Sequence, residues 1–299
     1  MKKILPVVLS SLLLLSGCGS SSSAPAEDPV EKYGSKTLKL FTWGEYLGEN
    51  VIQNFEEQFG VDVIVEYFDS NEMMYTKLAA GDSYDVIVPS DYMIQRLIGE
   101  EMLQPLDKSL IPNMEVLTDG VKNLAYDPEN EYSVPYTWGT TGIIYNPNMV
   151  QQPITKWADL FDEEKVGTHS VLMFDNSRDC IAIALMALGY DINTTDASQI
   201  TEAVDLLVKQ KQDGIVQAYV MDQIFDKMTN NEAAAGVYYA GDYLIMVEDN
   251  PDLVWVQPEE GANWFVDSMC VPTTCKNYDN AMAFINFMCE NTSFVRNFD

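Results

Sequence analysis

Residues 41–47 (FTWGEYL) bring together an indole, a carboxylate and a phenol at Trp43, Glu45 and Tyr46. A carboxylate beside aromatic rings is suited to hold an organic cation, because the carboxylate neutralises the charge and the ring faces attract it. A structural interpretation also fits, in which Trp43 and Tyr46 anchor a core and Glu45 favours the N-terminus of the following helix. On this stretch alone, both interpretations stay open.

The overall charge restricts the kinds of partner that this chain can have. Among 299 residues, 46 are acidic and 17 are basic, which gives a formal charge of -29. Nucleic acids and anionic lipid surfaces carry the same sign, so the balance disfavours them and favours cationic partners. A hydrophobic content of 47% is sufficient for one or two sizeable cores, and we expect two lobes of ordinary size.

The N-terminus has the pattern of a secretory signal. Lys2 and Lys3 precede an apolar run over residues 4–15, which is too short to span a bilayer permanently. Residues 15–18 (LSGC) are similar to the bacterial lipoprotein signal, in which the cysteine is lipidated and becomes the mature N-terminus. We therefore predict a signal peptide at residues 1–17, a lipidated Cys18 with a flexible tether to residue 35, and an extracytoplasmic protein that is lipid-anchored to the cell membrane or periplasmic.

The elements that must position Trp43 alternate between strand and helix. Apolar residues recur at helical spacing before Gly60, which predicts a helix end there, and Ser70 is placed to cap the next helix. This alternation is typical of the α/β class, in which helices cover a parallel sheet. We expect strands over residues 37–41, 61–68 and 85–88, with helices over 49–59 and 70–81 between them.

Ligands of such sheets bind at the carboxyl ends of the strands, where loops carry polar groups into a crevice. Two loops meet this condition, at residues 43–46 and 89–92. One βαβ unit separates them, so they are expected at the same end of the sheet. Ser90 and Tyr92 are thereby predicted to face the same space as the residues of the first loop.

An extended segment over residues 132–146 divides the chain, because Gly139 and Gly142 allow the backbone to turn or flex between two bodies. We place the first lobe at residues 36–138, the second at 139–250 and the return to the first at 251–299. The second half is expected to contain strands at 170–174, 235–239, 253–256 and 264–271, and helices at 179–188, 196–212 (with a capping box of Asp196 and Gln199), 221–229 and 279–289.

No catalytic or metal-binding motif is present. The only histidine, His169, is adjacent to Ser170, which is too close in sequence to build a hydrolytic triad. Phosphate-binding loops, zinc motifs and dinucleotide-binding fingerprints are absent from the sequence. We predict a protein that is not an enzyme and that uses no cofactor and no metal.

Four cysteines remain after Cys18. Their number allows three disulfide connectivities, and their spacing dictates none of them. We favour their interpretation as small buried hydrophobic residues over disulfides. They are Cys180, Cys270, Cys275 and Cys289.

Six motifs together connect the chain to a known family: FTWGEYL, YDVIVPSDYMI, VPYTWGTTGIIYN, FDNSRD, LGYDINTTD and WFVDSMCVP. Over nearly its whole mature length the chain resembles the bacterial spermidine/putrescine-binding lipoproteins, the solute-binding components of ABC-type polyamine importers. The resemblance implies a two-lobed periplasmic-binding-protein-like fold of type II, with mainly parallel sheets and the ligand in the cleft between the lobes. It also implies a monomer that delivers putrescine or spermidine to a permease and its ATPase.

The resemblance, followed residue by residue, implies a site of rings and acids. Trp43 and Tyr46 match the family's aromatic clamp, and Glu45 matches the acid beside them. In the second half, Asp179 matches an acid that holds an amine, and Asp267 matches the acid that anchors an ammonium group. The other matching pocket positions are Ser90, Tyr92, Asn176, Tyr239 and Phe265.

Some positions depart from the family. Asn176 stands where close spermidine binders carry a carboxylate, which favours the shorter diamine, although Asp242 is placed to compensate. Tyr239 and Phe265 stand where the family has other aromatic residues, so the ring faces are kept but their size differs from those of the family. The resemblance also implies a further C-terminal segment, with another aromatic pocket residue, beyond Asp299.

Two alternatives stay open on the sequence. Adjacent tyrosines at Tyr238 and Tyr239 resemble those of ferric-ion receptors of the same fold. An acidic cleft also suits an extracellular carboxylate hydrolase, in which Glu45 or Asp267 would act as acid or base.

Overall fold

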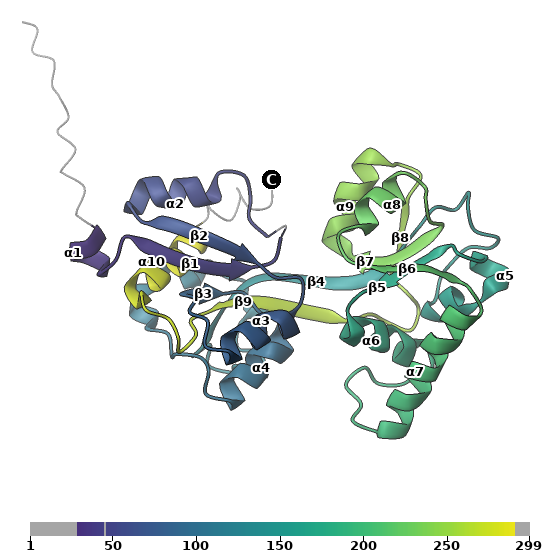
Figure 1. Ribbon diagram of the computed structural model, residues 1–299, viewed down its shortest axis with the longest axis horizontal. Coiled ribbons are helices and arrows are strands. Elements are labelled where there is room, and N and C mark those ends of the chain that lie inside the picture. Colours follow the sequence, from purple (N-terminus) through teal and green to yellow (C-terminus); the bar gives the residue numbers. More distant parts are fainter. Residues whose placement is uncertain (1–28, 45, 291–299) are drawn as a thin grey trace, which may run out of the picture.

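The first lobe follows the alternation that the sequence predicts (Figure 1, left). Strand β1 pairs in parallel with both β2 and β3. Gly60 ends α2 in the left-handed conformation, and the Ser70 side chain accepts from the Met73 N–H at the start of α3. The elements are α1 (Pro29–Tyr33), β1 (Thr37–Thr42), α2 (Val51–Phe59), β2 (Asp62–Tyr67), α3 (Asn71–Ala79), β3 (Val86–Ile87), α4 (Asp91–Gly99), η1 (Lys108–Leu110), η2 (Pro112–Val116), η3 (Asp119–Val121) and α10 (Tyr278–Met288).

This computed structural model describes residues 29–44 and 46–290. Two strands, β4 (Ser133–Tyr145) and β9 (Trp264–Cys270), run from one lobe to the other, and we call them the crossing strands (Figure 1). They pair antiparallel with each other, and the far half of β4 then pairs with two strands of the second lobe. The order β2-β1-β3-β9-β4-β7-β5-β6 is therefore one continuous sheet that serves both lobes.

The second lobe is built around a parallel set of three strands, in which β5 pairs with both β6 and β7 (Figure 1, right). Asn176 caps the N-terminus of α6, and the Asp196 side chain accepts from the Ser198 N–H at the start of α7. The elements are η4 (Trp157–Phe161), α5 (Glu163–Val166), β5 (Val171–Phe174), α6 (Ser177–Ala187), α7 (Ala197–Gln212), β6 (Val216–Val220), α8 (Ile224–Thr229), β7 (Ala235–Tyr239), α9 (Ala240–Asp249) and β8 (Val254–Val256). The two-lobed α/β fold is confirmed.

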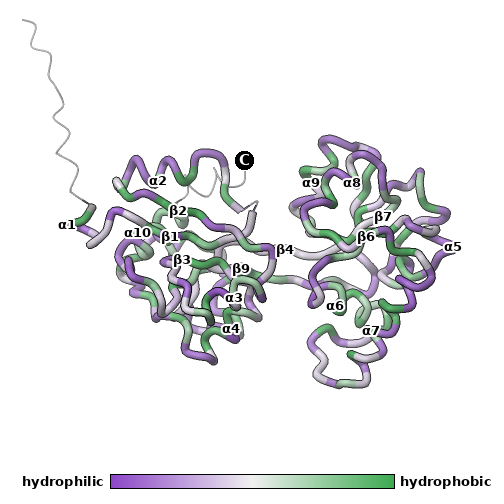
Figure 2. The backbone as a smooth tube through the Cα atoms, viewed as in Figure 1, coloured by the Kyte–Doolittle hydropathy of each residue, from purple (hydrophilic) through white to green (hydrophobic). Residues whose placement is uncertain are grey.

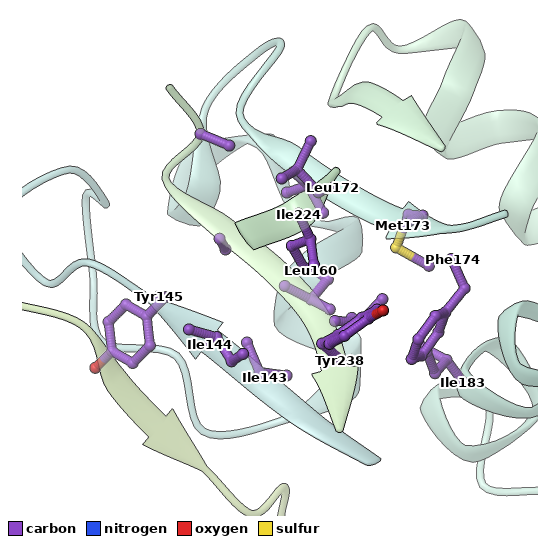
Figure 3. Packing of buried hydrophobic residues seen from close by; sticks show 14 of the residues in the cluster. Ile143, Ile144, Tyr145, Leu160, Leu172, Met173, Phe174, Ile183, Ile224 and Tyr238 are labelled. Atoms are coloured by element: carbon purple, nitrogen blue, oxygen red, sulfur yellow. The ribbon is translucent and has the colours of Figure 1, made fainter. Parts of the chain in front are cut away.

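Each lobe has its own hydrophobic core. In the first lobe, one cluster lies between the sheet, α2 and α10, and a second lies against α3 and α4. In the second lobe, Ile143 and Ile144 of β4 pack beside Tyr238 of β7 and near Phe174 of β5 (Figure 3). Hydrophilic stretches follow the outer helices, as Figure 2 shows for α2, while the strands are more hydrophobic. The central strands β3 and β5 are buried along their whole length, as is expected of parallel strands covered on both faces.

Three expectations differ from the structure. Strand β8 pairs with residues 143–145 of β4, so the segment after residue 251 still belongs to the second lobe and the return begins at β9. Helix α8 begins at Ile224, three residues later than predicted, because residues 221–223 form a turn after β6. The capping box is incomplete, since Gln199 Oε1 accepts from the Thr194 hydroxyl at 2.6 Å.

The cysteines have no disulfide bonds within the described part of the chain: Cys180, Cys270 and Cys289 are buried, and Cys275 is half-buried. Among the same residues, no helix has the length and hydrophobicity needed to cross a membrane.

The junction of β4 and β8 gives a test of packing in the second lobe. A Cβ atom on Gly142 would overlap Cζ2 of the half-buried Trp255 ring, so β8 would have to move. Gly142→Ala is expected to lower the free energy of unfolding by about 2 kcal/mol, measured by urea denaturation. Gly99→Ala is the matched control, because no atom lies within 4 Å of its added methyl. A loss for Gly142→Ala no larger than that of the control would contradict this packing.

Candidate functional site

A cavity of about 920 Å³ lies between the two lobes, with the crossing strands at its base. This volume is within the range of small-molecule sites in proteins. Glu45 lies outside the described residues. The structure brings together the nine other predicted site residues in the wall of this cavity: Trp43, Tyr46, Ser90, Tyr92, Asn176, Asp179, Tyr239, Phe265 and Asp267.

Asp267 is the most buried acid of the site. It lies on β9 opposite Thr137 of β4, and only 1% of its surface is exposed. The Tyr46 hydroxyl donates a hydrogen bond to its Oδ2, whereas no described residue donates to its Oδ1. Burial raises the pKa of Asp267 to about 7, although the nearby hydroxyls of Tyr46 and Ser90 act in the opposite direction. A buried carboxylate with an unpaired oxygen requires a cation or a proton.

Asp179 is the corresponding acid of the second lobe, in the first turn of α6. Its Oδ2 accepts from the Tyr239 hydroxyl at 3.0 Å and from Asn176 Nδ2 at 3.1 Å, and its Oδ1 accepts from Asn263 Nδ2 at 3.4 Å. Burial raises the pKa of Asp179 above its usual value, against the opposing effect of the Tyr239 hydrogen bond. Among the described residues, neither Asp179 nor Asp267 forms an ion pair with a basic side chain.

Asn176 has a structural function that the sequence did not indicate. Its Oδ1 accepts from the backbone N–H of Arg178 at 3.0 Å and caps α6, while its Nδ2 donates to Asp179. The amide therefore orients the Asp179 carboxylate, and a carboxylate in its place would add a like charge beside it.

Aromatic rings of both lobes line the cavity. In the first lobe, the Trp43 Nε1–H donates to the Val88 carbonyl at 2.9 Å, and its ring centroid lies 4.5 Å from that of Phe68 and 6.1 Å from that of Tyr46. Trp43 thus packs on the core and also lines the cavity. Both interpretations of this residue, as a core anchor and as a ring that faces a ligand, are compatible with its position. At the opposite wall, the centroids of Tyr239 and Phe265 are 5.4 Å apart, with the rings nearly perpendicular.

Ser90 and Tyr92 lie at the start of α4. The Ser90 hydroxyl accepts from Asn71 Nδ2 at 2.9 Å, and Ser90 forms an isolated β-bridge with Asp267. The Tyr92 hydroxyl donates to Glu72 Oε1 at 2.9 Å, and the Arg178 guanidinium lies over its ring, 4.0 Å from the centroid. Because Arg178 belongs to the second lobe, this cation–π contact joins the two lobes across the cavity.

Sequence reasoning missed several residues of the cavity wall. Arg178 belongs to the FDNSRD motif, but the motif does not indicate a role for its side chain. Its contact with Tyr92 joins segments that are 86 positions apart in the sequence. Asp222 was hidden by the predicted helix over residues 221–229, but it lies in the turn after β6, at the carboxyl end of a strand. That position is the signal that could have found it.

The adjacent tyrosines do not form an evident iron site. The Tyr238 hydroxyl donates to Asp222 Oδ1 at 3.0 Å, and the Tyr239 hydroxyl donates to Asp179. Burial and the nearby Asp179 raise the pKa of Tyr239 well above its usual value, which disfavours the phenolate that ferric iron binds. Within residues 29–44 and 46–290, no cluster of three or more histidine, cysteine or acidic side chains could hold a metal ion.

A two-lobed α/β protein with a charged and aromatic cavity over two crossing strands has the architecture of a binding protein that encloses its ligand. The family model of bacterial extracellular solute-binding proteins matches residues 50–298. The chain therefore belongs to the bacterial extracellular solute-binding protein family.

The names of several similar proteins refer to spermidine and putrescine. The spermidine/putrescine-binding periplasmic protein of Escherichia coli is 34% identical over 270 residues, covering 89% of this chain and 75% of that protein. A solved structure of a putative spermidine/putrescine transporter from Listeria monocytogenes is 38% identical, with a TM-score of 0.83 over 87% of this chain and 80% of that one. The spermidine/putrescine substrate-binding protein of Streptococcus pneumoniae is 39% identical, with a TM-score of 0.71 and the same coverages.

Burial of Asp267 predicts how stability changes with pH. Because the pKa of Asp267 in the folded protein is about 7 and its usual value is 3.8, the folded state binds the proton more tightly. This group's contribution to stability is present below pH 4 and is lost as the pH rises toward 7 and above. Asp267→Asn removes the buried charge and is expected to raise the unfolding free energy of the ligand-free protein at pH 8 by about 2 kcal/mol.

Urea denaturation of the wild type and of Asp267→Asn at pH 5 and pH 8 measures this effect. The difference between the two proteins should be larger at pH 8. Asp205→Asn, which removes an exposed charge from α7, is the control and should show no such dependence. An equal difference at both pH values would show that Asp267 is ionised throughout this range.

Proposed function

We propose that this protein is an extracytoplasmic polyamine receptor, which binds putrescine or spermidine between its lobes and delivers it to an ABC import permease. One observation carries the proposal: two buried carboxylates, Asp179 and Asp267, face a single aromatic-lined cavity, and one oxygen of Asp267 has no donor among the described residues. Membership in a family of solute-binding proteins supports binding without catalysis. The names of the similar proteins support a polyamine as the ligand.

The chemistry of a polyamine matches this cavity. Each ammonium group needs an anionic partner when water is excluded, and Asp267 Oδ1 offers one at the base of the cavity. The methylenes between the ammonium groups need apolar contact, which the faces of Trp43, Tyr46, Tyr239 and Phe265 provide. Glu45 lies outside the described residues, and its part in holding the ligand stays a prediction from the sequence.

Closure of the lobes would complete the site. The crossing strands are the two connections about which the lobes can rotate, and a ligand that contacts both lobes favours the closed form. The proposed partners are the permease and its ATPase. We also propose that the protein acts as a monomer and that lipid on Cys18, which lies outside the described residues, holds it at the membrane.

Isothermal titration calorimetry tests the proposed function directly. The wild-type protein is expected to bind putrescine or spermidine at pH 8 with a dissociation constant in the micromolar range or tighter, because two charged contacts are shielded from water. At pH 5.5 the Asp267 carboxyl is largely protonated before binding, since its pKa is about 7. A cationic ligand must then displace that proton, so affinity should fall by about tenfold for each pH unit below 7.

An amine with a single charge, butylamine, is the matched control ligand, because it has the same carbon chain as putrescine and lacks one ammonium group. It should bind at least tenfold more weakly than putrescine. The absence of heat and of thermal stabilisation with both polyamines at millimolar concentration would contradict the proposed function.

Trp43 offers a second test, because its ring serves the core and the cavity. Trp43→Ala should weaken polyamine binding about tenfold through the lost ring face. It should also lower the unfolding free energy by about 2 kcal/mol, since the bond to Val88 and the contact with Phe68 are lost. Trp43→Phe keeps a ring and is expected to retain most of the binding. Calorimetry and urea denaturation separate the two effects, and unchanged affinity in a folded Trp43→Ala protein would remove Trp43 from the site.

A further inference from the structure

Asp222 is an acid of the cavity that the family resemblance does not assign. It lies in the turn after β6 and is exposed, unlike Asp179 and Asp267. Its Oδ1 accepts from the hydroxyl of Tyr238 at 3.0 Å, and Tyr238 itself is buried on β7. The carboxylate is therefore held in place by a phenol of the core, although it is open to solvent.

Asp222 also extends across the cavity toward the first lobe. Its Oδ2 lies 3.8 Å from the position that a Cβ atom on Gly44 would take. Gly44 is part of the loop that carries Trp43 and Tyr46, and both Gly44 and Asp222 line the cavity. Because residue 44 has no side chain, the loop of the first lobe places only backbone beside Oδ2 of the exposed Asp222.

Two successive tyrosines of β7 arrange two acids along one wall. Tyr239 donates to the buried Asp179, and Tyr238 donates to the exposed Asp222, with the two ring centroids 4.9 Å apart. Asp267 Oδ1 has no described donor at the base of the same cavity. The anionic groups therefore continue from the buried base of the cavity to its solvent-exposed side.

We propose that Asp222 is a specificity-determining residue that receives the third ammonium group of a triamine, so that it strengthens the binding of spermidine but not of putrescine. This inference rests on the proposed function. Spermidine is putrescine extended by an aminopropyl group. When Asp179 and Asp267 hold the diamine part, the added ammonium must lie farther along the cavity, where Asp222 offers Oδ2. Asp242, which the sequence places to compensate for Asn176, also lines the cavity, and Asp222 would add a second negative charge to it.

Calorimetric titration of Asp222→Asn with spermidine and putrescine at pH 8 tests the inference. The substitution keeps the shape of the side chain and removes its charge. Spermidine affinity is expected to fall fivefold to tenfold, which is modest because the site is exposed, while putrescine affinity changes less than twofold. Asp226→Asn is the matched control: it makes the same change of charge on α8, at an exposed position outside the cavity wall.

A second variant checks that the position of the carboxylate matters as well as its charge. Tyr238→Phe removes the hydroxyl that holds Oδ1 and leaves Asp222 in the chain. It should weaken spermidine binding in the same direction but by a smaller factor, and the thermal midpoint of each variant shows that it is folded. An equal loss for both ligands in Asp222→Asn, or no loss for spermidine, would overturn the inference while the wild type still binds polyamines. A wild type that binds neither ligand would overturn the proposed function itself.

Discussion

The hydrogen bond from the Tyr46 hydroxyl to the buried carboxylate of Asp267 joins the aromatic loop after β1 to the crossing strand β9, and the site depends on both. Tyr46 belongs to the loop that follows β1, and Asp267 belongs to the crossing strand β9. The Tyr136 hydroxyl of β4 also donates to the backbone carbonyl of Tyr46. The loop with the aromatic rings is therefore bound to both crossing strands. If these bonds were absent, Tyr46 would lose its direct connection to the buried acid, whereas the Trp43 ring would still be held by Val88 and Phe68.

The continuous sheet explains why a charge can be tolerated at this point. Thr137 of β4 lies opposite Asp267, so the backbone around the acid is paired and only its side chain needs a partner. The acid is then costly in its ionised form, as its raised pKa shows, and a cation would relieve that cost. The fold thus stores an unfavourable interaction in the ligand-free state and concentrates it where a positive charge can enter.

The order of strands and helices could be predicted from the sequence because local signals determine it. Gly60 and Ser70 act through the backbone of their own helices, and apolar spacing marks the faces that are buried. The predicted site residues, Glu45 apart, line one cavity because most of them follow strands, and the carboxyl ends of parallel strands meet at one edge. Local patterns were therefore sufficient to place the two loops of the first lobe together, and the resemblance to the family added the site residues of the second half.

Contacts between distant segments could not be predicted in this way. The three residues of β8 read as a strand, but their pairing with β4 depends on the packing of Trp255 over Gly142. The stacking of Arg178 on Tyr92 depends on how the lobes approach each other. Asn176 was interpreted through the acid that it replaces, whereas its geometry is that of a helix cap that orients Asp179. In each case the tertiary arrangement determines what a side chain does.

The position of Asp267 on a crossing strand has a mechanical consequence. When one body rotates relative to another, the atoms near the axis move least and those far from it move most. Asp267 lies on one of the two strands that connect the lobes, whereas Arg178 and Tyr92 lie on helices on either side of the cavity. The environment of the buried acid should therefore be nearly the same in open and closed forms. In the proposed closure, a ligand would form its strongest electrostatic contact first, and the contacts remote from the axis would follow as the lobes close.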